Sequence, residues 1–345
     1  MESRAKYLII FLGSAAVFIF LMGFFKNSST KKPEVPVVNK VTPSEVKSTI
    51  PFAPQSVKFN EVSPEDTGHP LPEYEVSGPL LIAPTFTDVA RLSESFGFTE
   101  SPQILPAYGG GTNYIYSDTG NRVLTVKDKP LSLSYSELQK ESAGGSLPTI
   151  PRASALAQEL AKKAVPNLPK GWSLGVIKSN YLRGTGSSSS VVQSLQDANL
   201  VEVSLGYYLQ DYKVATADGK FKFFKAVFGD FGTVVSFKAA LVVNNPALTV
   251  NKLRDLTPLT LEGVREGFNQ GMAKAVFLGL ADEHTDEPIL TPPQVVTVSA
   301  VEPILVLSPA ALHPYYLVTA QGSLNSNRVG EVLYLLPVSQ SQTKK

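Results

Sequence analysis

The sequence predicts an α+β protein whose antiparallel sheets occur in tandem helix-plus-β-meander units, preceded by one transmembrane helix. Three observations favour this fold class. A charge-free apolar run covers residues 7–25, a polar segment rich in proline follows it, and the remainder alternates helical periodicity with runs of period two. Because several short alternating runs follow each helical stretch, we expect antiparallel sheets with helices on one face.

The apolar run YLIIFLGSAAVFIFLMGFF at residues 7–25 predicts an uncleaved membrane anchor. With about 1.5 Å of rise per residue it would span about 28 Å, close to the hydrocarbon thickness of a bilayer. A cleaved signal peptide is the alternative, but its apolar region would be about 7–15 residues long and would end in an A-x-A-like site. The following FFKNSSTKK lacks that site.

Basic residues flank both ends of this run, so the orientation rests on which end is easier to export. Residues 1–6 are predicted to stay in the cytoplasm. The sequence thus predicts a single-pass protein of the cell membrane with its C-terminal domain extracytoplasmic. Cysteine is absent, which excludes a lipid-modified cysteine as the anchor and also excludes disulfides and thiolate chemistry.

Residues 26–79 are predicted to form an extended stalk, because prolines recur throughout a polar segment. Residues 339–345 form a short polar tail. Between them, residues 80–150 are predicted as the first unit. Its helix DVARLSESF begins at an N-cap, Thr87, and ends at Gly97, and the strands TNYIYS, NRVLTV and PLSLSYS follow.

Residues 151–250 are predicted as the second unit, with Pro151 heading the helix RASALAQELAKKAV. Its strands include Trp172–Leu182, LVEVSLGYYLQDYKVA, KFFKAVFGD and TVVSFKAALVV. The Asp218–Gly219 turn predicts a hairpin.

Residues 251–338 are predicted as the third unit, with helical periodicity from about Thr260 to Phe277. The strands QVVTVSAVEPILVLS, PYYLVTAQGSL and RVGEVLYLLPV follow that helix. Pro303 lies inside the first of them and predicts an edge position or a bulge.

Charge and motifs argue against several functions. The 345 residues hold 31 Lys plus Arg and 30 Asp plus Glu, for a net charge of +1, so nucleic acid is not an expected partner. The loop DEHTDEP offers Asp282, His284 and Asp286 as metal-ligand candidates. Because HExxH, EF-hand and GxSxG patterns are missing, we expect no catalytic residues, no cofactor and no enzyme activity. An envelope hydrolase or metal-dependent enzyme using residues 282–287 remains the alternative.

Aromatic residues are the other candidate feature. Side chains alternate across a strand, so half of the aromatic residues in the meanders face the core and half face outward. Tyr208, Phe224 and Tyr316 are predicted to contribute to an exposed interaction surface, with cross-strand packing inside the sheet as the alternative.

The whole layout, together with ANLVEVSLGYYLQDYKV and EPILVLSPAALHPYYLVTAQG, resembles the YycH/YycI-type regulatory proteins. That family consists of membrane-anchored ectodomains that modulate a sensor histidine kinase in bacterial cell-wall control. The resemblance implies a non-enzymatic binding or regulatory protein of the cell envelope with a protein or envelope partner, and it carries no catalytic residue over. A structural spacer or assembly subunit is a further alternative.

Overall fold

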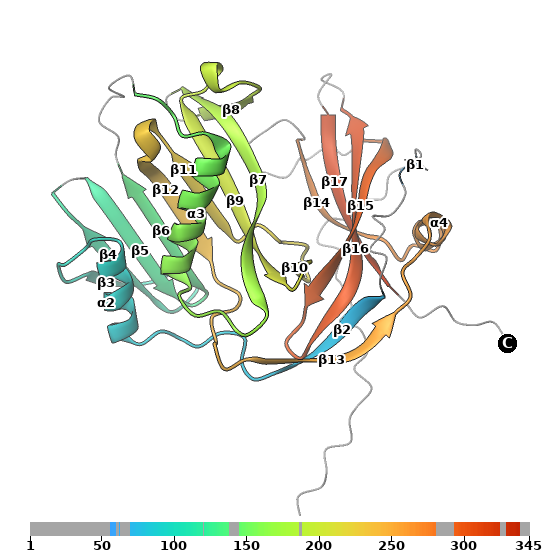
Figure 1. The fold of residues 1–345 in the computed structure, drawn as a ribbon, viewed down its shortest axis with the longest axis horizontal. Coiled ribbons are helices and arrows are strands. Elements are labelled where there is room, and N and C mark those ends of the chain that lie inside the picture. The colour runs from blue at the N-terminus through green and yellow to red at the C-terminus, as the bar shows by residue number, and fades with distance from the viewer. Residues whose placement is uncertain are drawn as a thin grey trace, which may run out of the picture. The chain divides into compact units, whose positions relative to one another are not determined.

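The computed structural model describes residues 56–59, 62, 70–119, 121–137, 145–185, 188–280, 293–324 and 329–338 (Figure 1). The chain divides into two units, Met1–Pro43 and Ser44–Lys345, and every described residue belongs to the second. The anchor predicted at residues 7–25 lies outside the described residues. Within them, no helix has the length and apolar character needed to cross a membrane.

The described chain is mostly antiparallel β-structure with three α-helices, which confirms the predicted α+β class at that level. The helices are α2 (Phe86–Ser95), α3 (Ile150–Ala164) and α4 (Leu261–Asn269). The strands are β1 (Ser56–Phe59), β2 (Leu71–Ser77), β3 (Gln103–Pro106), β4 (Thr112–Ser117), β5 (Arg122–Asp128), β6 (Leu131–Glu137), β7 (Trp172–Thr185), β8 (Ser188–Val192), β9 (Leu200–Leu209), β10 (Tyr212–Thr216), β11 (Phe224–Phe228), β12 (Val234–Ala240), β13 (Thr249–Leu256), β14 (Lys274–Leu280), β15 (Val295–Leu307), β16 (Ala311–Ser323) and β17 (Val329–Pro337).

A first sheet runs in the order β3-β4-β5-β6-β12-β11-β9-β7-β8, and all of its neighbours are antiparallel. Helices α2 and α3 lie on one of its faces (Figure 1). Apolar residues at alternate strand positions, such as Leu124, Val203 and Phe237, are buried beneath these helices. Because β6 pairs with β12, this sheet runs across the boundary predicted at residue 150.

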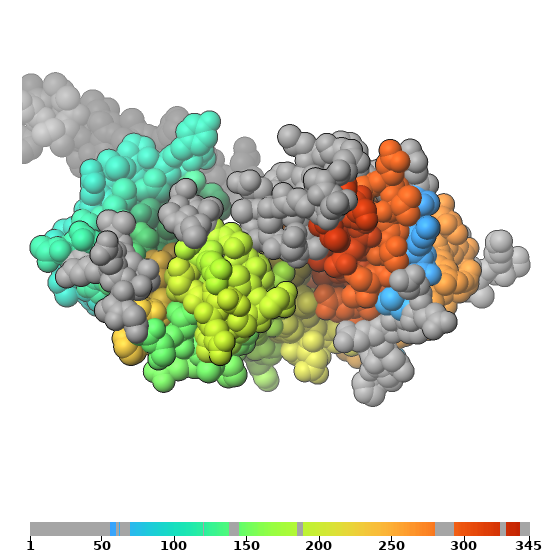
Figure 2. Space-filling view, turned by 90° about the horizontal axis from the view of Figure 1, so that it is seen from above, coloured from blue at the N-terminus to red at the C-terminus, as the bar shows by residue number. Residues whose placement is uncertain are grey.

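A second sheet is centred on the pair β15 and β16. On the outer edge of each of these two long strands, two other strands pair with different segments. Beyond β16 lie β17 and then β14 at one end, and β2 and then β13 at the other. On the far side of β15, β1 and β10 pair with it in parallel. Figure 2 shows β1, in blue, beside β15 and α4. The ring centroids of Phe59 in β1 and Phe268 in α4 are 5.4 Å apart in an edge-to-face contact. Because β10 also pairs with β9, it joins the two sheets.

Two predicted helix boundaries are wrong. Helix α2 begins after Thr85, not Thr87, because Thr85 and Asp88 form a reciprocal capping box. Helix α4 begins after the predicted Thr260 but ends at Asn269, well before Phe277. Gly271 adopts a φ of +68°, which terminates the helix, and residues from Lys274 onward pair with β17 as β14.

The stalk prediction for residues 26–79 is also wrong in its C-terminal part, where Ser56–Phe59 form β1 and pair with β15. Residues 71–77 form β2, which is largely buried and pairs with both β13 and β16. Pro70 and Pro72 gave this segment the composition of a linker. Pro72 is nevertheless accommodated in the ladder opposite Asp255, so the proline pattern alone did not distinguish a strand from a stalk.

The Asp218–Gly219 sequence does form a turn, closed by a hydrogen bond from the Thr216 amide to the Lys220 carbonyl at 2.9 Å. The strands on its two sides do not form the predicted hairpin ladder, because β10 and β11 pair with different parts of β9. The tight connection is instead at Gln210, whose φ of +54° separates β9 from β10. The edge position predicted for Pro303 is confirmed on one side of β15. Pro303 lies between the segment of β15 that pairs with β1 and the segment that pairs with β10.

Candidate functional site

The candidate metal ligands Asp282, His284 and Asp286 lie in a segment outside the described residues. Within the described part of the chain, no group of three or more histidine or acidic side chains is placed to hold a metal ion. The predicted acidic loop therefore stays a prediction.

The predicted aromatic surface is wrong for two of its three residues. Phe224 and Tyr316 are each about 1% exposed. Phe224 lies beneath α3 and stacks on Phe237, and the Tyr316 hydroxyl accepts a hydrogen bond from the Leu259 amide at 3.1 Å. Tyr208 is half-buried and sits directly over Gly175 of β7, whose missing side chain makes room for the ring. Cross-strand packing, the alternative interpretation, accounts for this set.

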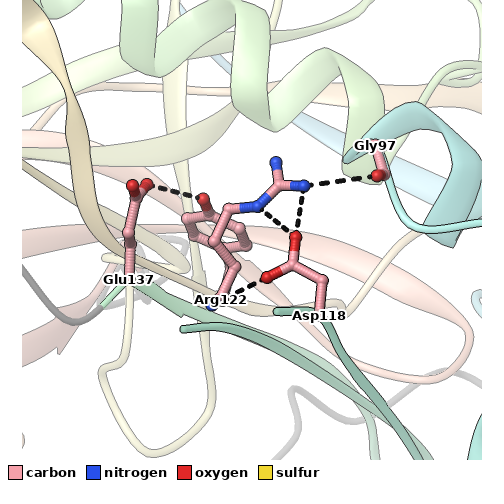
Figure 3. A network of polar contacts seen from close by, with 5 residues as sticks. Gly97, Asp118, Arg122 and Glu137 are labelled. Carbon is pink, nitrogen blue, oxygen red and sulfur yellow. Dashed lines mark hydrogen bonds and ion pairs between the residues drawn. The ribbon is translucent and has the colours of Figure 1, made fainter. Parts of the chain in front are cut away.

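A polar network around Arg122 clamps the end of α2 to the β4–β5 hairpin (Figure 3). The Arg122 guanidinium forms an ion pair with Asp118, donates to the Gly97 carbonyl at 3.4 Å and stacks 5.3 Å from the Phe98 ring centroid. Close by, the Tyr135 hydroxyl donates to Glu137. These contacts satisfy one another, so we assign the network a structural role.

The face of the first sheet opposite α2 and α3, called here the open face, carries lysine and hydroxyl side chains. On β6, Ser132, Ser134 and Ser136 alternate with buried apolar residues. Lys238 of β12 lies opposite Ser134 on one side and opposite Lys225 of β11 on the other. The open face is therefore polar, whereas the face that α2 and α3 cover is apolar.

One cross-strand row on the open face holds three lysines, Lys178, Lys225 and Lys238, called here the lysine row. Ser204 of β9 lies between Lys225 and Lys178 in the register. With strands about 4.8 Å apart, the row extends over about 14 Å. Like charges placed directly opposite each other destabilise a sheet, and Lys225 and Lys238 are such a pair.

A hollow of about 430 Å³ lies over this part of the open face and is called here the first hollow. Among the described residues, five lysines and no acidic side chain line it. They are Lys127, Lys220, Lys222, Lys225 and Lys238, with hydroxyl groups from Thr125, Ser132, Ser134 and Ser204 between them. Glu202, buried in the next row of the sheet, forms an ion pair with Lys225 at 3.1 Å.

A second hollow, of about 610 Å³, lies between the two sheets near β10. Its lysines are Lys178, Lys213, Lys220 and Lys222, and its acidic groups are Asp218, Glu302 and Glu331. Lys213 is mostly buried and forms an ion pair with Glu302 at 2.8 Å. The charge of the second hollow is thus mixed, whereas the charged groups that the described residues contribute to the first hollow are all lysines.

The lysine row cannot be recognised from the sequence alone. The alternation of serine and apolar residues in LSLSYSE was visible, and so were the lysines at alternate positions near Phe224 and Phe237. What the sequence could not supply is the register that brings β6, β12, β11, β9 and β7 together, because their pairing joins segments as far apart as residues 134 and 238.

Comparison with models of known protein families gives no match for this chain, and comparison with curated proteins gives none either.

Proposed function

We propose that this protein is a membrane-anchored extracytoplasmic binding or regulatory protein of the bacterial cell envelope, and that its open face binds an anionic partner. The binding is non-enzymatic in this proposal. The anchor at residues 7–25 would tether the protein to the membrane, and the resemblance to YycH/YycI-type proteins suggests that occupancy of the open face is passed on to a sensor kinase.

The lysine row is the observation that carries the proposal. Lys225 already has a counter-charge in buried Glu202, but Lys238 places a second positive charge directly opposite Lys225, and the repulsion between the two lysines opposes pairing of β11 with β12. An anion bound between the two side chains would reverse the sign of that interaction. Lysine ammonium groups and serine hydroxyls are also the donors that anionic oxygens accept.

The net charge of +1 does not argue against this site, because the charge is distributed unevenly. The first hollow gathers five lysines over neighbouring strands, and such a concave basic surface focuses the electrostatic potential locally. The net charge is a sum over the whole chain, so it cannot report on a patch of this size.

Binding of long-chain inorganic polyphosphate by the full chain, purified in a neutral detergent, tests the proposal. We expect the Lys225→Met/Lys238→Met double variant to lose affinity by about tenfold or more, since each lysine supplies a charge-assisted contact. Lys162→Met/Lys170→Met removes the same charge from exposed positions on α3 and the loop after it and is the matched control.

A second measurement is the salt dependence of binding. The logarithm of the affinity should fall linearly with the logarithm of the salt concentration, with a shallower slope for the double variant than for the control. Equal affinity and equal slope for the two double variants would refute the open face as the binding site.

A further inference from the structure

The first and second hollows are lined in part by the same residues. Lys220 and Lys222 contribute to both, and the lysine row extends from Lys238 in the first hollow to Lys178 in the second. The two hollows therefore adjoin at Lys220 and Lys222 and are together called here the groove, which has lysines in both parts and acidic groups in the second. A small anion would fill only one part of it.

We infer that the ligand of this groove is a linear phosphate polymer, such as a polymer linked by phosphodiester bonds, which lies along both hollows. The inference rests on the proposed function and specifies its ligand class. A chain with a charge at each unit can contact the lysines of the two hollows at once, and linked contacts bind more tightly than the same contacts made separately.

The donor chemistry favours phosphate over carboxylate. The described lining of both hollows contains no arginine, whose planar guanidinium fork matches a carboxylate in two-point contacts. It offers instead compact lysine ammonium groups and, in the first hollow, serine and threonine hydroxyls, which can converge on a phosphate group from several directions. An acidic peptide is therefore the less favoured occupant.

The aromatic residues of the lining argue against a nucleic acid. Proteins that hold single strands stack bases on exposed aromatic rings. Phe221, Phe223 and Phe224 are buried within the walls of the hollows, at 9%, 3% and 1% exposure. Phe277 is half-buried, so the described lining does not present a row of exposed rings to successive bases.

The groove is not uniform in charge. The charged residues in the described lining of the first hollow are all lysines, whereas the second hollow contains Glu302, which neutralises Lys213 through their 2.8 Å ion pair. The first hollow should thus anchor one part of the polymer, and the second should add affinity only when the polymer is long enough to reach it. Chain length becomes the variable that tests continuity.

The experiment measures binding of the full chain in neutral detergent to triphosphate and to inorganic polyphosphates of increasing length. After correction for the number of equivalent binding positions, the affinity should rise steeply with length and then level off once both hollows are occupied. An affinity per phosphate that does not change with length would overturn the continuous groove.

Two variants separate the hollows. Lys238→Met should weaken triphosphate and long polyphosphate alike, because it removes charge from the first hollow. Glu302→Gln removes the acidic group beside Lys213 and should strengthen binding of long polyphosphate several-fold while leaving triphosphate unchanged. If Glu302→Gln affects both probes equally, or neither, the second hollow is not part of the site.

Competition identifies the polymer class. Polyglutamate and oligothymidylate of matched charge should compete more weakly than polyphosphate. Stronger competition by polyglutamate would overturn the phosphate assignment while leaving an anion-binding open face intact. Stronger competition by oligothymidylate would overturn the argument against a nucleic acid. Failure of all three polymers to bind would refute the proposed function itself, which distinguishes the two failures.

Discussion

The imidazole Nδ1 of His313 lies 2.7 Å from Oε1 of Glu73, and both side chains are buried. The other carboxylate oxygen of Glu73 accepts a hydrogen bond from Nε of Arg254. These residues lie on β16, β2 and β13, so a single carboxylate joins three strands of the second sheet across 240 residues of sequence. An isolated buried charge is unfavourable, but both oxygens of the Glu73 carboxylate have a partner.

Glu73→Ala should lower the free energy of unfolding by about 1–3 kcal/mol, because it leaves the buried imidazole without its partner. Urea unfolding monitored by circular dichroism measures the effect. Glu75 is exposed on the same strand, so Glu75→Ala is the matched control and should change stability little. Equal unfolding midpoints for the two variants would contradict a stabilising role for the Glu73–His313 pair.

The same carboxylate predicts a dependence of stability on pH. Burial raises the pKa of Glu73, but hydrogen bonds and positive charge from Arg254 and His313 together hold that pKa below the usual value of 4.5. A group whose pKa is lowered on folding contributes stability above its unfolded pKa and loses it as the pH falls through the folded pKa. The free energy of unfolding should thus decline below about pH 4.5.

Glu73→Gln cannot ionise and isolates this contribution. The difference in unfolding free energy between the native chain and Glu73→Gln should narrow as the pH is lowered from neutrality through pH 4.5. A difference that stays constant over that range would show that Glu73 does not titrate in this way.

Local patterns predicted most elements of this fold, and the interactions that connect distant segments account for the differences. The run TNYIYS corresponds to β4 without change, because its alternation and its flanking turns are both local signals. Residues 274–277 fall inside the predicted helix, since their apolar residues also fit helical spacing, and only pairing with β17 makes them part of the strand β14. Tertiary contacts decided between two locally acceptable conformations.

The candidate site was less predictable than the fold for the same reason. Aromatic residues such as Phe224 and Tyr316 are conspicuous in a sequence, yet their large apolar surface favours burial. Lysines are individually unremarkable at the surface. What distinguishes Lys225 and Lys238 is that β11 and β12 pair in a register that places them directly opposite each other.

Gly219 tests the contact between the two sheets. It has a φ of +77°, and a Cβ atom there would collide with Val276 of β14. Gly109 has a similar φ of +81°, with nothing within 4 Å of the corresponding position. Gly109→Ala should therefore lower the free energy of unfolding only through backbone strain, by about 1–2 kcal/mol. Gly219→Ala should lower it by a further amount of about 1–3 kcal/mol through overpacking.

Urea unfolding of both alanine variants gives the comparison, and the difference between them measures the packing of the β10–β11 turn on β14. Equal losses would show that the turn yields freely and that the second hollow lacks a rigid wall at Val276. Because Lys220 follows Gly219, the same variants also report whether the turn must be fixed for the groove to bind polyphosphate.

The lysine row leads to a prediction in which stability and binding change in opposite directions. Lys238→Met removes the repulsion between facing lysines on β11 and β12 while keeping most of the side-chain stem. Its unfolding free energy in the absence of ligand should stay equal or rise by about 0.2–1 kcal/mol, and the gain should shrink at high salt as the charges are screened. Lys162→Met on α3 is the control and should show no such salt-dependent gain. A loss of stability in Lys238→Met would mean that Lys238 supports the fold, and the repulsion would then cease to be a reason to expect an anion at the open face.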